Sequence, residues 1–170
     1  MVSPYPVARI LVPTDFSTCS DAALELAAKI AADQSAALVV LHVVEHAGLP
    51  SDAVIHPPTP PEGITVVAYT TELAERALAS RIAVLPIDRS RVRQVIRHGA
   101  PAKVITSFVD EVGACLIVMG THGRTGLSHV LAGSIAEKLV RTSLVPVMTV
   151  REPVCREQPL DPGLDAETEG

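Results

Sequence analysis

Several residue types are scarce in this chain, and each shortage excludes a class of protein. The 170 residues include no tryptophan, two tyrosines and two phenylalanines, which leaves little aromatic surface on which single-stranded bases could stack. The three cysteines, Cys19, Cys115 and Cys155, are far apart and form neither a CxxC pair nor a disulfide framework, as is typical of a reducing compartment. We therefore predict a cytoplasmic protein that does not bind nucleic acid.

Long apolar runs are also missing. None approaches the ~20 residues of a membrane span, and the N-terminal sequence MVSPYPVAR lacks the basic start and apolar core of a signal peptide. Hydrophobic residues nevertheless make up 48% of the chain, which is typical of a globular protein with a buried core. The composition therefore predicts one globular domain that does not contact membranes.

Acidic residues are concentrated at the C-terminus. Up to Val150 the chain has 12 Lys/Arg and 13 Asp/Glu, whereas the last twenty residues have 2 and 6. The segment 152–170 contains three prolines and shows neither a helical nor a strand period. We therefore predict a near-neutral domain over residues 1–151, followed by a disordered acidic tail over 152–170 that is a solvated end or an interaction arm.

Apolar runs alternate with amphipathic segments along the rest of the chain. Continuous apolar runs are typical of strands in a parallel sheet that is covered on both faces. The predicted strands lie within 8–15, 36–44, 90–99, 114–120 and 145–151, the first ending near Val12, and the predicted helices lie within 16–34, 69–85, 100–113 and 134–143. Ser17 or Thr18 is expected to cap the first helix, and the Pro-rich segment 45–63 is predicted to be a loop. This alternation predicts an α/β fold: a single open five-stranded parallel sheet, Rossmann-like, with helices on both faces.

The segment RSRVRQVIRH alternates arginines with Val92, Gln94 and Ile96. A stripe of this kind can contact nucleic acid, but the body of the chain is near neutral. We therefore interpret the segment as an edge strand whose charged face discourages pairing with another sheet.

The stretch MGTHGRTGLSHVLAGS, residues 119–134, has four glycines and no acidic residue. It contains neither a Walker GxxxxGK[ST] loop nor a GxGxxG dinucleotide motif. Gly133 and Ser134 directly precede a predicted helix, whose N-terminal N–H groups favour a bound anion. The stretch is therefore either a backbone cradle for phosphate or a loop whose glycines only form turns.

With ILVPTDFS near the N-terminus and VPVMTVR at the end of the domain, this glycine pattern resembles the universal stress protein A family. The spacing G-x2-G-x9-G-[ST] is similar to that of the family's ATP-binding subgroup, and the resemblance covers residues 7–151. It implies a sheet like that of the adenine nucleotide alpha hydrolases. It also implies nucleotide contacts from Pro13, Thr14, Asp15, Val43, Met119, Gly120, His122, Gly123, Gly133, Ser134 and Ile135.

The resemblance implies a role for each part of this site. Asp15 would lie near the ribose or the adenine edge, Val43 would contact adenine through its backbone, and Met119 and Gly120 would flank the ribose. The remaining residues, from His122 to Ile135, would contact the phosphates. Two alternatives stay open from the residues themselves: Asp15 could cap the following helix, and Arg124 could contact phosphate or be solvated.

The implied function is a stress regulator that binds ATP, or AMP or ADP, with little or no catalysis. A Mg²⁺ or Mn²⁺ ion would be bound mainly through the phosphates, and no protein-built metal site is expected, because the histidines lack ligand spacing. The resemblance also implies a homodimer formed through the last strand, Val145 to Val150. A slow ATP hydrolase and an interaction module with an empty pocket are the alternatives, and no catalytic residue is assigned.

Overall fold

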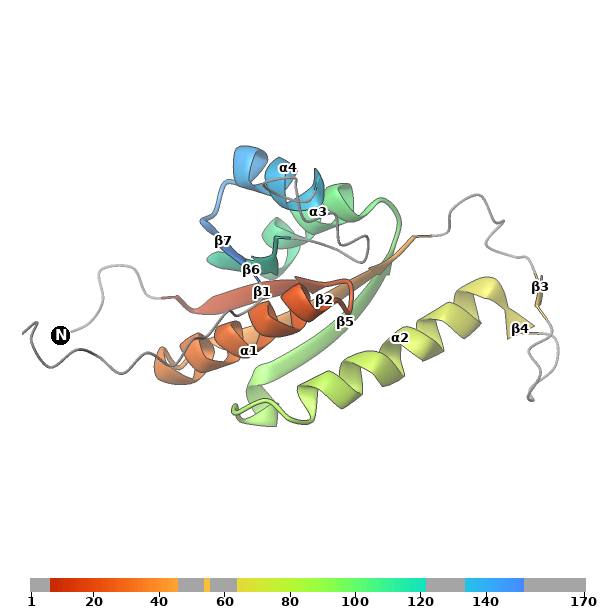
Figure 1. Cartoon of the computed structure of the whole chain (residues 1–170), viewed down its shortest axis with the longest axis horizontal. Helices are drawn as coiled ribbons and strands as arrows, with labels where there is room; N and C mark the ends of the chain where they lie inside the picture. The colour runs from red at the N-terminus through yellow and green to blue at the C-terminus, as the bar shows by residue number, and fades with distance from the viewer. Residues whose placement is uncertain (1–6, 46–53, 56–63, 122–133, 152–170) are drawn as a thin grey trace, which may run out of the picture.

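The chain folds around one parallel sheet of five strands (Figure 1). The computed structural model describes residues 7–45, 54–55, 64–121 and 134–151. The strands are β1 (Arg9–Thr14), β2 (Ala37–Val44), β5 (Val92–His98), β6 (Leu116–Gly120) and β7 (Val147–Val150), in the spatial order β5-β2-β1-β6-β7. Every neighbouring pair in this sheet is parallel. The predicted open five-stranded α/β sheet is confirmed.

Helices cover both faces of the sheet. They are α1 (Thr18–Asp33), α2 (Val66–Ile82), α3 (Pro101–Val112) and α4 (Ser134–Thr142), and a 3₁₀ turn, η1 (Arg89–Arg91), precedes β5. Helices α1 and α2 lie on one face, and α3 and α4 lie on the other (Figure 1). None of these helices in the described part of the chain is long and apolar enough to cross a membrane.

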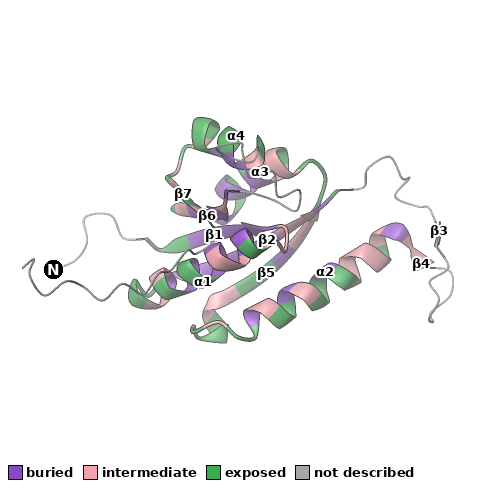
Figure 2. Cartoon of the chain, in the orientation of Figure 1, coloured by how far each residue is buried: buried purple, intermediate pink, exposed green. Residues whose placement is uncertain are grey.

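Two apolar cores separate the helices from the sheet, because side chains alternate along each strand. Ile10 and Val12 pack against α1 and α2, whereas Leu11 packs against α3 and α4, and all three are fully buried. Figure 2 shows this burial along the central strands. The continuous apolar runs therefore reflect strands that are covered on both sides.

The structure differs from the predicted elements at three places. Strand β1 continues past Val12 to Thr14, because Pro13 and Thr14 still align with β2. Helix α2 begins at Val66, where the Thr65 side chain accepts a hydrogen bond from the Ala68 N–H. The loop prediction for 45–63 is wrong at one point, since β3 (Val54–Ile55) pairs antiparallel with β4 (Ile64–Thr65). Residues with high strand propensity face each other there.

Strand β5 forms one edge of the sheet, as the alternating arginines predict. The guanidinium carbon of Arg97 lies 5.0 Å from the centre of the Phe108 ring on α3. Arg97 also forms an ion pair of 2.7 Å with Glu111 on the same helix. The edge position predicted for this segment is therefore confirmed, and Arg97 is held against α3.

Candidate functional site

The sheet has a topological switch point between β1 and β6. From β1 the chain adds β2 and β5 on one side, and β6 and β7 then lie on the other side of β1. Ligands of open α/β sheets bind beyond the carboxyl ends of the strands at such a point. Helix α4 connects two parallel strands, so its N-terminus lies at the same edge. The carboxyl ends of β1 and β6 and the start of α4 therefore define the candidate site.

The turn after β1 has a defined network of hydrogen bonds around Asp15. Its Oδ1 atom accepts from the Ser17 backbone N–H at 3.1 Å and from the Ser17 hydroxyl at 2.6 Å. Ser17 is the N-cap residue of α1 and accepts from the Ser20 N–H. Of the two predicted caps, Ser17 rather than Thr18 is therefore the one observed. Asp15 itself is not the cap but supports the residue that is.

These contacts also determine the charge state of Asp15, which is half-buried. Burial alone raises the pKa of its carboxyl group, but the hydrogen bonds from the Ser17 side chain and backbone lower it. The resulting pKa lies below the usual value of an aspartate. The carboxylate is therefore ionised at neutral pH and is able to accept hydrogen bonds from hydroxyl or amino groups.

Phe16, directly after Asp15, has a backbone φ of 66°, a left-handed conformation that costs an L-residue about 1–2 kcal/mol. Its N–H donates to the Thr14 hydroxyl oxygen at 3.1 Å. Its ring stacks on the His42 ring, with centroids 4.2 Å apart, and His42 Nδ1 donates to the Thr14 carbonyl oxygen at 2.8 Å. The strained turn is therefore tied to the ends of both β1 and β2.

Arg81, near the end of α2, contacts the same turn. Its guanidinium carbon lies 4.8 Å from the centre of the Phe16 ring, and Nη2 donates to the Phe16 carbonyl oxygen at 3.2 Å. Its Nε atom donates to Asp21 on α1 at 2.6 Å. Sequence reasoning missed Phe16, His42 and Arg81, because no local pattern indicates contacts between residues that are 28 or 65 positions apart in the sequence.

Gly120, the last residue of β6, lies against the first turn of α1. A Cβ atom at this position would be 2.9 Å from the Cys19 carbonyl carbon, the Cys19 Cβ and the Ser20 nitrogen. Any larger residue would therefore push β6 and α1 apart. Gly120 thus has a packing role in addition to the ribose contact that the family resemblance implies.

The other predicted site residues in the described part of the chain lie on these elements. Pro13 and Met119 are buried within β1 and β6, and Val43 is half-buried near the end of β2. Ser134 is exposed at the start of α4, and Ile135 packs against the core beneath it. Thr14 is buried, and its hydroxyl lies 3.0 Å from that of Ser20. His122, Gly123, Arg124 and Gly133 lie outside the described residues.

No group of three or more His, Cys, Asp or Glu side chains that could hold a metal ion occurs among the described residues. The ionised carboxylate of Asp15 and the N-terminal N–H groups of α4 are of opposite electrostatic character. The edge therefore offers an acceptor for hydroxyl or amino groups and a separate donor for anions. A ligand that combines a sugar or base with phosphate has both kinds of group.

A family model, described as the universal stress protein family, matches residues 6–151. The chain belongs to this family. Among its relatives, the universal stress protein MJ0531 of Methanocaldococcus jannaschii is 30% identical over 151 residues, which are 85% of this chain and 82% of the relative.

Solved structures of universal stress proteins have the same fold. The UspA structure from Lactobacillus plantarum is 26% identical, with a TM-score of 0.64, and the match covers 85% of this chain and 98% of that one. Two structures at 23% and 22% identity, with TM-scores of 0.59 and 0.57, are complexes with cAMP and, from Archaeoglobus fulgidus, with dAMP. They cover 87% and 85% of this universal stress protein and 99% and 98% of their own chains. At this identity the likeness to the two complexes concerns the fold alone.

Proposed function

We propose that this universal stress protein binds an adenine nucleotide, ATP or its products AMP and ADP, at the carboxyl edge of the sheet. It acts as a nucleotide-responsive stress regulator with little or no catalysis. One observation carries the proposal: the ionised Asp15 lies at the switch point, where β6 and α4 also present their ends. That cAMP and dAMP occupy more distant structures of the same fold supports an adenine nucleotide as the ligand.

The nucleoside and the phosphates of the ligand contact different parts of the proposed site. Asp15 accepts hydrogen bonds from the ribose or the adenine edge, the Val43 backbone contacts adenine, and Met119 and Gly120 flank the ribose. The phosphates bind backbone N–H groups at the start of α4, where the helix dipole favours negative charge. The contacts to phosphate come from Ser134 and Ile135, and from His122, Gly123, Arg124 and Gly133 outside the described residues. A Mg²⁺ or Mn²⁺ ion accompanies the phosphates.

The proposal includes self-association through the last strand, Val145 to Val150. Strand β7 is the edge opposite β5, and an unpaired edge with apolar side chains favours pairing with a second copy. Met148 on β7 is 39% exposed, and Leu144 just before it is 92% exposed. We also propose that the protein is cytoplasmic, which the wide spacing of its three cysteines in the sequence supports.

Two measurements test the nucleotide proposal. Mass spectrometry of small molecules released from the purified protein is expected to detect ATP, ADP or AMP. Calorimetry with ATP then compares the parent chain with Asp15→Asn, which keeps an acceptor for Ser17 but removes the charge. We expect the Kd for ATP to rise about tenfold or more, because a hydrogen bond to a charged group contributes ~1.5–3 kcal/mol.

Asp88 provides the matched control. Like Asp15, Asp88 accepts hydrogen bonds from the N–H and hydroxyl of the serine two positions later, both at 2.9 Å. Asp88 precedes β5, however, and therefore lies at the amino ends of the strands, away from the proposed nucleotide site. Asp88→Asn is expected to leave the Kd for ATP unchanged. A parent chain that neither releases an adenine nucleotide nor binds ATP would contradict the proposal. Equal affinity in the parent and Asp15→Asn would contradict the role of Asp15.

A further inference from the structure

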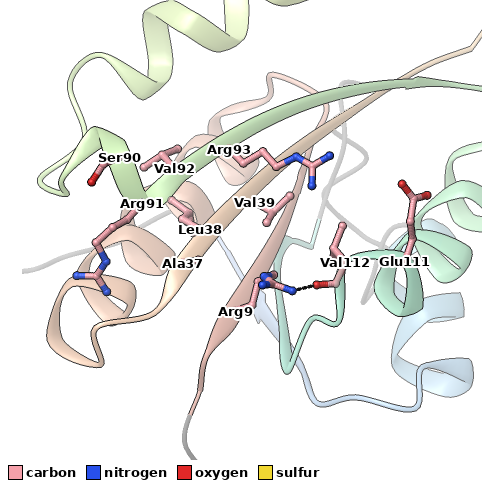
Figure 3. Close-up of a pocket in the computed structure, with 10 residues that line it drawn as sticks. All are labelled: Arg9, Ala37, Leu38, Val39, Ser90, Arg91, Val92, Arg93, Glu111 and Val112. Carbon is pink, nitrogen blue, oxygen red and sulfur yellow. Dashed lines mark hydrogen bonds between the residues drawn. The ribbon is translucent and has the colours of Figure 1, made fainter.

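A hollow lies at the end of the sheet where β1, β2 and β5 begin (Figure 3). Its volume is about 310 Å³, within the range of small-molecule sites. We call it the arginine groove. The residues that line it are Arg9, Ala37, Leu38, Val39, Ser90, Arg91, Val92, Arg93, Glu111 and Val112. Because the strands are parallel, this groove lies at their amino ends, whereas the proposed nucleotide site lies at their carboxyl ends.

Arg9 and Arg93 reach the groove from two strands on either side of β2. Val39 pairs in register with Arg93 on β5 and with Leu11 on β1. In Figure 3 the guanidinium groups of Arg9 and Arg93 lie on the same side of the sheet as Val39 and Val112, whereas that of Arg91 points away from them. The floor between the two cations is apolar, since Val39 is only 3% exposed.

The three arginines differ in how far their hydrogen bonds are already satisfied. Arg91 donates through Nη2 to the carbonyl oxygens of Ala31 and Ala36, at 3.0 and 2.8 Å. Arg9 donates through Nη1 to the Val112 carbonyl oxygen at the end of α3. The side chain of Arg93 has no hydrogen-bond or ion-pair partner among the described residues. A guanidinium group has five N–H donors, so Arg9 and Arg93 retain most of theirs.

The negative groups near the groove already have partners. Glu111 forms its ion pair with Arg97, outside the set of lining residues. The carboxyl end of α3 has a partial negative charge, which Arg9 offsets through its bond to Val112. The charge of Arg93 is therefore not balanced within the described residues, although the chain up to Val150 is near neutral.

We infer that the arginine groove is a second ligand site, which binds a small anion with phosphate or carboxylate groups between Arg9 and Arg93. Guanidinium groups form paired, charge-assisted hydrogen bonds with both kinds of oxyanion. This site does not depend on the nucleotide proposal, because it shares none of its residues. The protein would therefore sense a small anionic metabolite at one edge of the sheet independently of a nucleotide at the other.

A titration of the full-length, ¹⁵N-labelled protein with inorganic pyrophosphate, at fixed ionic strength, tests this inference. Pyrophosphate can also reach the phosphate end of the other site, but the amide shifts separate the two locations. We expect saturable shifts at groove residues such as Leu38, Val39 and Val112. In Arg93→Gln the Kd obtained from these amides should rise about tenfold or more, because two charge-assisted bonds are lost.

Arg89 supplies the matched control, because it is an exposed arginine on η1 that does not line the groove. Arg89→Gln removes the same charge and should change the Kd less than about twofold, since exposed charges are screened by salt. The Arg93 side chain has no partner to lose within the part of the chain that the structure describes, so its variant should fold as the parent does, which the amide spectrum verifies. The inference is overturned if groove amides show no saturable shift, or if both variants weaken binding equally.

Discussion

At the scale of single residues, the Asp15 carboxylate connects the stability of the fold with the proposed site. The same oxygen that accepts two hydrogen bonds from Ser17 belongs to the group that we expect to contact the nucleotide. These bonds favour the ionised form, and the pKa of Asp15 is lowered although burial opposes this shift. Protonation would weaken both the start of α1 and the binding of a ligand.

The lowered pKa of Asp15 predicts how stability depends on pH. An aspartate in the unfolded chain has a pKa of about 3.9, and the folded value is lower. The stabilisation is therefore fully present above the unfolded pKa and is lost as the pH falls through the folded pKa. We expect the free energy of unfolding to decrease more steeply below about pH 4 in the parent than in Asp15→Asn, which has no charge to lose.

Urea unfolding followed by circular dichroism over this acidic range measures the effect. Asp88→Asn serves as the comparison, because the pKa of Asp88 is also lowered by bonds from the N–H and side chain of Ser90, but Asp88 is exposed and caps η1 rather than α1. A parent and an Asp15→Asn variant with the same pH dependence would show that Ser17 does not stabilise the carboxylate.

The glycine spacing explains only one of the two roles that we assign to Gly120. Its place in the G-x2-G-x9-G-[ST] spacing predicts closeness to a ligand. The structure adds a reason that the spacing does not contain, since a Cβ at this position would overlap with Cys19 and Ser20 on α1. That reason depends on where α1 crosses β6, so no local pattern indicates it.

At the scale of elements, the turn between β1 and α1 is stabilised by a different helix. Arg81 on α2 covers the Phe16 ring, donates to its carbonyl oxygen and pairs with Asp21. These contacts offset the strain of the left-handed backbone at Phe16. Because Asp15 and Ser17 flank Phe16, these contacts of Arg81 also hold the backbone on either side of Phe16.

Arg81→Lys is predicted to destabilise the protein by about 1–2 kcal/mol, because a lysine cannot both stack on Phe16 and donate in two directions. Arg76→Lys on the same helix is the control. Arg76 is largely exposed and, as far as the structure describes the chain, forms an ion pair only with Glu72 four positions earlier, so the change should cost less than about 0.5 kcal/mol. Urea denaturation of the parent and both variants compares them, and equal losses would contradict a special role for Arg81.

At the scale of the whole molecule, the order of the strands determines which segments meet. Strand β1 lies between β2 and β6, so the end of the first strand adjoins segments that follow much later in the chain. The same order leaves β5 and β7 as the two edges. One edge has the arginines of β5, and the other has the apolar side chains that we assign to self-association.

If two copies pair through β7, a charge added to this strand should weaken the dimer. Met148→Lys places a charge on the exposed face of β7, and like charges from two copies would repel each other across a dimer interface. We expect its dimer dissociation constant, measured by sedimentation, to rise about tenfold or more. Leu73→Lys is the matched control on α2, where Leu73 is 48% exposed. Equal dissociation constants for Met148→Lys and the parent would contradict pairing through β7.

The sequence alone determined the fold class and the family. The alternation of apolar runs with amphipathic segments predicts the fold class, and the glycine spacing before α4 indicates the family. Both are local patterns, so they can be recognised without knowing which distant residues are in contact. The tertiary structure decided the rest. The stack of Arg81 on Phe16, the approach of Gly120 to α1 and the groove that Arg9 and Arg93 both line involve residues that are far apart in the sequence. Such contacts depend on strand order and register, which a period of two or 3.6 residues does not encode.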